Sequence, residues 1–138
     1  MSMKTNIFVN LTTKDLERAK GFFTGLGFSI NPQFTDDKAA CVVIDENIYA
    51  MIVTEPFFEK LAKRKAADNT SAVECAVCLS CESREKVDEF VQKALSMGAT
   101  ENIVPEMSVG DSMYGKSIND LDGHIWEFMW IDPKIIQK

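Results

Sequence analysis

The stretch FVNLTTKDLERAKGFFTGLGF, residues 8–28, combines two periodicities that decide the fold class. Its first part belongs to an apolar, β-branched run over 6–11, which is typical of a strand. Residues 15–28 then carry apolar side chains at helical spacing, namely Leu16, Ala19, Phe23 and Leu26. Thr12 or Asp15 can cap the start of this helix. The stretch therefore predicts a strand that leads directly into an amphipathic helix.

Three further strand-like runs follow this predicted helix in the first half of the chain. They lie near 28–34, 39–45 and 48–54, and residues 46–47 suit a hairpin turn between the last two runs. Residues 1–54 are thus predicted to form a βαβββ unit.

The second half of the chain, residues 72–138, repeats this order. A strand is predicted over 72–81 and a helix over 83–99. Strands follow near 102–107, 112–118 and 124–130, and the turn DLDG joins the last two. The two predicted helices lie about half a chain length apart, so we infer that one βαβββ unit has been duplicated.

A connecting segment, residues 55–71, lies between the two units, and the whole chain 1–138 is predicted to be a single domain. Thr54 as a cap and Pro56 in the first turn favour a short helix in this segment. Its basic side chains fit a solvated linker face better than an anion site. They are Lys60, Lys63, Arg64 and Lys65.

Composition and charge exclude several classes of protein. Of the 138 residues, 46% are hydrophobic and 26% are charged, which is typical of a globular domain. The formal net charge of −6 argues against nucleic acid as a partner, because phosphate binding needs a basic face. No secretory signal and no apolar run of membrane-spanning length is visible. We therefore expect a cytoplasmic protein with reduced cysteines and no membrane association.

Three of the four cysteines have the spacing C-x2-C-x2-C, which is typical of iron–sulfur proteins. Because neighbouring side chains of a strand alternate between faces, Cys75 and Cys81 share one face and Cys78 lies on the other. Three ligands cannot converge from these positions, and Cys41 is far away in the sequence. We interpret the cysteines as small buried hydrophobic residues.

Both ends of the chain resemble one superfamily. The opening stretch resembles the strand-into-helix signature of the vicinal oxygen chelate superfamily, also called the glyoxalase/bleomycin resistance/dioxygenase superfamily. The closing stretch YGKSINDLDGHIWEFMW, residues 114–130, resembles its final hairpin, and is most similar to the lactoylglutathione-lyase-like subgroup. The resemblance implies an α+β fold in which tandem βαβββ units form an incomplete curled barrel, with outer helices and an inner cavity. Since the superfamily includes lyases, isomerases, ring-cleaving dioxygenases and antibiotic-sequestering proteins, activity has to be inferred from the site.

Metal-using members take four histidine, glutamate or glutamine ligands from the first and last strands of each unit. The resemblance places these four positions at Phe8, Met51, Ala76 and Glu127. Glu74 takes the place of Ala76 if the second helix begins at a slightly different residue. Because zinc, nickel and iron need at least three good protein ligands, we predict no metal site and no cofactor.

His124 is the only histidine of the chain and lies in DLDGHIWEF, residues 120–128. Strand alternation places it on the face of Trp126, whereas Glu127 lies on the other face. It also lacks a serine or cysteine partner at a spacing that indicates nucleophilic catalysis. We therefore interpret His124 as a turn or helix-packing residue.

The same alternation predicts an apolar, methionine-rich ligand site with few polar groups. A carboxylate in such surroundings loses hydration, so Glu127 is the candidate catalytic or ligand-orienting residue. Alternatively, these side chains fill a closed core. The predicted ligand-binding residues are Phe8, Asn10, Tyr49, Met51, Glu74, Ala76, Met113, Tyr114, Lys116, Glu127 and Met129.

Three functions are compatible with this site. The first is a homodimer that binds a small molecule without a complete metal site, and its acidic net charge favours cationic ligands. The second is an enzyme, either a metal-dependent lyase or isomerase of the lactoylglutathione lyase type or an acid–base catalyst that uses Glu127. The third is a structural or interaction role with the pocket closed.

Overall fold

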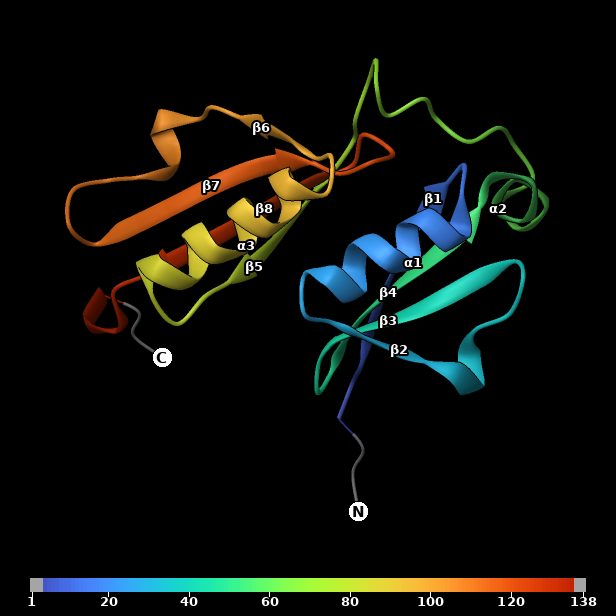
Figure 1. Cartoon of the computed structure of the whole chain (residues 1–138), viewed down its shortest axis with the longest axis horizontal. Helices are drawn as coiled ribbons and strands as arrows, with labels where there is room; N and C mark the ends of the chain where they lie inside the picture. The colour runs from blue at the N-terminus through green and yellow to red at the C-terminus, as the bar shows by residue number, and fades with distance from the viewer. Residues whose placement is uncertain (1–3, 136–138) are drawn as a thin grey trace. The chain divides into compact units, whose positions relative to one another are not determined.

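The computed structural model describes residues 4–135 and divides at the Ala67–Asp68 junction into two compact units. Each unit is built on its own four-stranded sheet (Figure 1). The junction lies inside the segment 55–71 that was predicted to connect the units. No strand of one sheet pairs with a strand of the other within residues 4–135.

The first unit contains one mixed sheet with the strand order β1-β4-β3-β2. Its β1 and β4 strands are parallel, and the other neighbouring pairs are antiparallel. The short helix α2 follows β4 and contacts both β4 and β1. The elements of this unit are β1 (Ile7–Thr13), α1 (Leu16–Gly25), β2 (Ser29–Asn31), the 3-10 helix η1 (Pro32–Phe34), β3 (Ala39–Asp45), β4 (Ile48–Thr54) and α2 (Glu55–Ala62).

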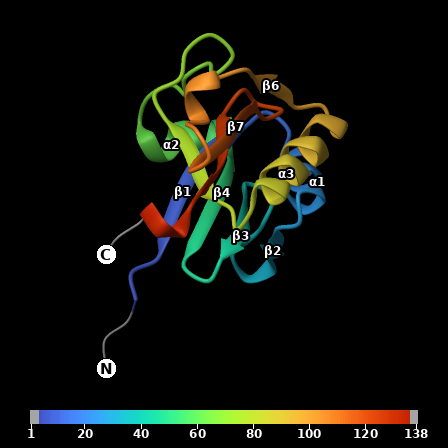
Figure 2. The same ribbon diagram turned by 90° about the vertical axis from the view of Figure 1, so that its left-hand side faces the viewer.

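The second unit repeats this topology with the strand order β5-β8-β7-β6. Here β5 and β8 are the parallel pair. Figure 2 shows α3 beside this sheet, and α3 contacts β7 and β8. The elements are β5 (Ala76–Ser80), α3 (Arg84–Ser96), β6 (Thr100–Asn102), the 3-10 helix η2 (Pro105–Met107), β7 (Met113–Asn119), β8 (Ile125–Ile131) and the 3-10 helix η3 (Pro133–Ile135). The prediction of tandem βαβββ units in an α+β fold is confirmed.

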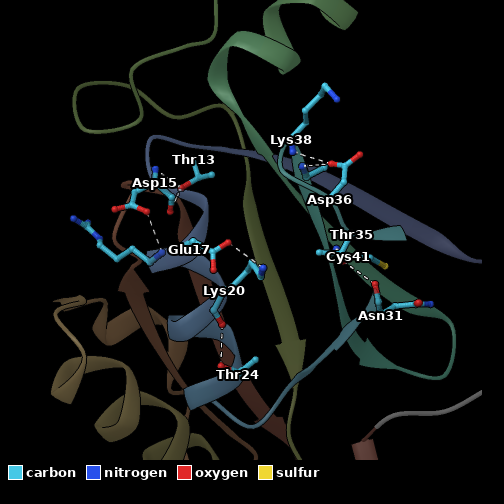
Figure 3. Close-up of polar contacts among 12 residues, drawn as sticks. Thr13, Asp15, Glu17, Lys20, Thr24, Asn31, Thr35, Asp36, Lys38 and Cys41 are labelled. Atoms are coloured by element: carbon cyan, nitrogen blue, oxygen red, sulfur yellow. Dashed lines mark hydrogen bonds and ion pairs between the residues drawn. The ribbon is translucent and has the colours of Figure 1, made fainter. Parts of the chain in front are cut away.

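The two long helices begin and end in the same way, which supports the duplication. At the start of α1 the side chain of Asp15 accepts a hydrogen bond from the Arg18 backbone (Figure 3), and Ser83 does the same for α3. Each helix ends in a Schellman motif with a glycine at positive φ, Gly27 at 109° and Gly98 at 104°. A residue with a side chain is strained in this conformation, so both glycines are required where they stand.

The second strand of each unit is shorter than predicted because a proline follows it. Pro32 and Pro105 each start a 3-10 helix, and proline cannot donate to a sheet ladder. The predicted strand 28–34 is therefore limited to β2, and the strand predicted at 102–107 ends at Asn102. After β2, Thr35 donates to the Asn31 carbonyl at 2.7 Å and accepts from the Cys41 backbone at 3.0 Å, as Figure 3 shows.

The strand predicted at 72–81 begins later, at Ala76. The amide of Ala72 still bonds back to the Asp68 carbonyl at 3.1 Å, so the chain at that point is in a turn. Glu74 therefore lies in the loop before β5, not on a strand that includes Ala76. This part of the prediction was wrong because the alternating apolar residues were assigned to a strand, and the turn that precedes the strand was overlooked.

The core of the second unit lies between α3 and one face of its sheet. Trp126 and Phe128 of β8 are completely buried, and Phe128 stacks on Phe90 of α3 at a centroid distance of 4.8 Å. Val87 and Val91 of α3 are buried against the same face. The other face of the sheet, which carries Glu127, is not covered by α3 and is therefore the candidate ligand face.

None of the helices within residues 4–135 is long and apolar enough to span a membrane.

Candidate functional site

One row of polar side chains crosses all four strands of the second unit. The strand register pairs Cys78 with Glu127, Glu127 with Ser117, and Ser117 with Asn102. Because paired residues project from the same face of a sheet, these four residues form a continuous line, which we call the Glu127 row. The row lies on the face opposite to Trp126 and Phe128.

Glu127, at the centre of this row, has an unusual environment for a carboxylate. It is partly buried, and it forms no hydrogen bond or ion pair with any residue that the structure describes. Its neighbour Cys78 has a raised pKa, first because the thiol is partly desolvated and then because the Glu127 charge repels a thiolate. The Glu127 carboxylate is thus available to a ligand.

An amide network, consisting of Thr100, Asn102, Ser117 and Asn119, continues the row toward the edge strand β6. Asn102 Nδ2 donates to Ser117 Oγ at 3.2 Å and to Asn119 Oδ1 at 3.1 Å. Asn119 Nδ2 donates to Asn102 Oδ1 at 2.8 Å and to Thr100 Oγ1 at 3.0 Å. The sequence analysis predicted few polar groups here and missed this network. The alternation of Ser117 and Asn119 along β7 was a sign in the sequence that this face is polar. Their partners lie on β6, and the strand predicted there began at residue 102 instead of Thr100.

Methionines cover the same face beyond the row. Gly115 pairs with Met129, and a Cβ atom at Gly115 would lie 2.8 Å from Met129 Cε and 3.0 Å from Met107 Cε. The side chains of Met107 and Met129 therefore occupy the space above this glycine. Met113 lies on the same face, paired with Ile131. The predicted placement of Met129 on the face of Glu127 is confirmed, and Met113, which was predicted at the mouth of the site, lies on the same face.

Tyr114 and Lys116 lie on the opposite face, so their predicted position beside Glu127 was wrong. They pair with Trp130 and Phe128, which face α3. Both contact Asp88 of α3, the Tyr114 hydroxyl at 2.5 Å and the Lys116 ammonium at 3.0 Å. The error has a simple cause, because a shift of one residue in strand register moves every side chain to the other face.

This contact with α3 changes the proton affinity of all three groups. Partial desolvation acts to raise the pKa of Asp88, but hydrogen bonds from Tyr114 and Lys116 together outweigh it and the pKa is lowered. The hydrogen bond to Asp88 raises the pKa of Tyr114 and of Lys116. The three residues fix α3 to β7 and are not part of the ligand face.

In the first unit, the four predicted ligand-binding residues share one face of the sheet, as expected. Phe8 pairs with Tyr49, and their rings stack at a centroid distance of 4.6 Å. Asn10 pairs with Met51. The polar groups are satisfied locally, because Asn10 donates to the Phe8 carbonyl at 3.3 Å and the Tyr49 hydroxyl donates to the Glu46 carbonyl at 3.2 Å.

The duplication places Met51 where the second unit has Glu127. In the first unit Asn10 and Met51 form a pair across the parallel strands, and the corresponding pair in the second unit is Cys78 and Glu127. Ala76 lies on the same face as Glu127, paired with Ile125. Only the second unit therefore presents a carboxylate at this position of its sheet.

The residues at the four ligand positions do not fit a transition metal. Phe8, Met51 and Ala76 carry no nitrogen or oxygen donor in the side chain, and Glu74 lies in a loop. Within residues 4–135, no three side chains of histidine, cysteine, aspartate or glutamate are grouped to hold a metal ion.

The histidine turn is organised by Asp120, which the sequence analysis did not single out. Asp120 Oδ1 accepts hydrogen bonds from the backbone amides of Asp122 at 2.9 Å and His124 at 3.0 Å, and Oδ2 accepts from Trp126 Nε1 at 2.9 Å. Burial raises the pKa of Asp120, although His124 and the three donors oppose this shift. His124 is buried in the turn before β8, as predicted.

The cysteines are less buried than predicted. Cys41 is buried, whereas Cys75 and Cys78 are exposed and Cys81 is intermediate. Cys75 and Cys81 flank the ends of β5, and the amide of Cys81 donates to the Met129 carbonyl at 2.7 Å. Cys78 thus belongs to the ligand face and is not a core residue.

Comparisons with known proteins relate this geometry to a fold family. Residues 5–45 match the family model described as bleomycin resistance protein-like N-terminal. A hypothetical protein from S. aureus, SA1046, is 28% identical with a TM-score of 0.75, over 94% of this chain and 95% of that chain. A glyoxalase/bleomycin resistance protein/dioxygenase family enzyme from Burkholderia phytofirmans PsJN is 16% identical with a TM-score of 0.74, over 90% of this chain and 96% of that chain. The chain has the glyoxalase/bleomycin resistance fold.

Proteins with this fold include an antibiotic resistance protein. The fosfomycin resistance protein FosX from Listeria monocytogenes is 15% identical with a TM-score of 0.66, over 99% of this chain and 97% of that chain. At this identity the likeness establishes the fold alone. A search of curated proteins found no match.

Proposed function

We propose that this protein binds a small organic cation on the ligand face of its second unit and that binding requires no metal ion. The observation that carries this proposal is the Glu127 carboxylate, which is partly buried and has no hydrogen-bond or ion-pair partner among residues 4–135. The match of residues 5–45 to a bleomycin-resistance-type model is consistent with a ligand-sequestering role.

The physical reason for a cationic ligand is the charge of the unpaired carboxylate. A cation can form a charge-assisted hydrogen bond with it, and neighbouring apolar groups strengthen that interaction by excluding water. Met113 and Met129 supply such groups on the same face and can adapt to ligands of irregular shape. The net charge of −6 also favours the approach of a cation.

The names of the related proteins suggest two first ligands, the cationic glycopeptide bleomycin and the anionic phosphonate fosfomycin. We expect metal-free protein to bind bleomycin or another amine-bearing compound of a small-molecule panel, and not fosfomycin, in isothermal titration calorimetry. Glu127→Gln should weaken binding of the cation about tenfold or more, because a charge-assisted hydrogen bond is replaced by a neutral one. Glu101→Gln is the matched control, since Glu101 is exposed on β6 and its register partner Ile118 faces away from Glu127.

Equal affinities of Glu127→Gln and wild type for every bound cation would overturn this assignment. If no compound of the panel binds at millimolar concentration, the closed-pocket alternative, with a structural or interaction role, is favoured instead.

The competing function is a metal-dependent lyase or isomerase of the lactoylglutathione lyase type. Glu127 is the one position at which this chain retains an oxygen ligand of that family. A direct assay uses the hemithioacetal of methylglyoxal and glutathione with added nickel or zinc. Turnover that is lost in Glu127→Gln would favour the enzyme over the binding protein.

A further inference from the structure

We infer that Ser117 is a positioning residue for Glu127 and that it makes the ligand face select a primary ammonium over a guanidinium. This inference rests on the proposed function, because it specifies the chemical class of cation that the same carboxylate binds. The amide network orients the serine.

The amide network leaves one donor of Ser117 unused. Ser117 Oγ accepts a hydrogen bond from Asn102 Nδ2 at 3.2 Å, so its hydroxyl proton points away from Asn102. Asn102 is itself fixed by two reciprocal hydrogen bonds with Asn119, at 3.1 and 2.8 Å. No hydrogen bond donated by the Ser117 hydroxyl occurs within the part of the chain that the structure describes. The Ser117 hydroxyl can therefore donate its proton to an acceptor outside the amide network.

The acceptor nearest in the sheet register is the carboxylate of Glu127. The two residues are direct partners on β7 and β8, and paired residues have Cβ atoms roughly 5 Å apart. They are not hydrogen-bonded to each other in this structure, but a change of the Glu127 rotamer, which leaves the bond from Asn102 to Ser117 in place, would bring one carboxylate oxygen within reach of the hydroxyl. Ser117 is 1% exposed and cannot meet a ligand itself, whereas Glu127 is partly exposed. Ser117 therefore acts through Glu127.

This arrangement distinguishes between two kinds of cation. A guanidinium binds a carboxylate best as a fork, with two parallel hydrogen bonds to both oxygens. An ammonium is a point charge that is satisfied by one oxygen. When Ser117 occupies one oxygen of Glu127, the other remains for a single N–H donor, so an ammonium gains more from the site than a guanidinium does.

Three probes that carry the same phenylethyl group test this selection. They are 2-phenylethylamine, 2-phenylethylguanidine and the neutral 2-phenylethanol. Their dissociation constants are measured by ligand-observed NMR for wild type, Ser117→Ala and Ser117→Cys. Alanine removes the hydroxyl, and cysteine fills the volume with a weak donor. Ser80→Ala is the matched control, since Ser80 is an exposed serine on β5 of the same face.

We expect wild type and Ser80→Ala to bind the amine about fivefold more tightly than the guanidine, as expected for one hydrogen bond. In Ser117→Ala and Ser117→Cys this ratio should fall to about one or below. An unchanged ratio in both variants, with the amine still bound through Glu127, overturns the role of Ser117 and leaves cation binding intact. Equal binding of all three probes by wild type, or no binding of any, overturns the selection; the proposed function is overturned separately, when no cation of the panel depends on Glu127.

Discussion

At the scale of single residues, Asp120 holds the turn from which β8 and Glu127 emerge. Its two carboxylate oxygens accept three hydrogen bonds, two from backbone amides and one from the buried Trp126 indole. Gly123 completes the turn with a φ of 88°, and a Cβ atom there would lie 2.8 Å from the Asn69 carbonyl. The alignment of the candidate ligand residue thus depends on one aspartate and one glycine.

Asp120→Ala is expected to lower the free energy of unfolding by about 2–4 kcal/mol, because it leaves two buried donors and one partly buried donor without an acceptor. Urea denaturation followed by tryptophan fluorescence measures the change. Glu106→Ala, an exposed residue of η2, is the control and should change stability by less than about 0.5 kcal/mol. A loss no greater than that of the control would mean that water replaces the aspartate.

The contact of Asp88 with Tyr114 and Lys116 predicts a pH dependence of stability. Because the folded pKa of Asp88 is lowered below its ordinary value of 3.8, its stabilising contribution is present above that pH and is lost as the pH falls through the folded pKa. In Asp88→Asn we expect a smaller loss of stability on acidification, measured as the urea midpoint between about pH 5 and pH 2.5. Glu85→Gln in the same helix should keep the wild-type slope. If the urea midpoint falls equally on acidification in wild type and in Asp88→Asn, the prediction is wrong.

At the scale of elements, the two faces of β7 have different roles. One face fixes α3 through Tyr114 and Lys116, and the other carries Ser117, Asn119 and the methionine-covered Gly115. The pairing with β8 decides which residue belongs to which face. Since both faces are used, a slip of one residue would disrupt the helix contact and the ligand face together.

Gly115→Ala is expected to destabilise the protein by about 1–3 kcal/mol, because the added methyl meets Met129 and Met107 at 2.8–3.2 Å and forces them to move. Gly21→Ala is the matched control, since nothing lies within 4 Å of a Cβ there and the residue is in α1. That change should leave stability equal or raise it by up to about 1 kcal/mol. Thermal unfolding of both variants measures the difference. If the two variants melt alike, the methionines do not pack tightly above Gly115.

At the scale of the whole molecule, the duplicated units have kept one topology and diverged in chemistry. Both sheets have the same order and the same parallel pair, but one presents Met51 and the other Glu127 at matched positions. Met51 has no oxygen or nitrogen donor in its side chain, whereas Glu127 has a carboxylate. A single acid is sufficient for ion pairing with a ligand but not for holding a transition metal.

Removal or addition of divalent metal should therefore leave stability unchanged. A metal that binds only the native state raises the melting temperature by mass action. We expect melting temperatures that agree within error for protein treated with EDTA and for protein supplied with nickel or zinc. A metal-dependent rise that is absent in Glu127→Gln would contradict the prediction and favour the lyase alternative.

We also predict that the protein is a homodimer. Sedimentation velocity over a range of concentrations should give a mass of twice the 15.5 kDa chain. A mass of one chain at all concentrations would contradict this prediction.

Much of the fold followed from local periodicity. β3 and β4 have the predicted bounds, and both long helices start within one residue of the predicted positions. The sequence was also sufficient to place Trp126 and Phe128 toward the helix and Glu127 on the other face. These features depend on residues close together in the chain, where spacing of 2 or 3.6 residues determines the face directly.

Only the tertiary structure decided the register of β7 and the polar partners of the Glu127 row. Tyr114 and Lys116 were assigned to the wrong face, and the pairing of Ser117 with Asn102 was not foreseen. The physical reason is that strand pairing joins residues far apart in the chain, and a change of one residue in register exchanges the two faces. The sequence by itself determined the order of elements and the apolar side chains at Phe8, Met51 and Ala76, whereas the neighbours of Glu127 depended on how the strands paired.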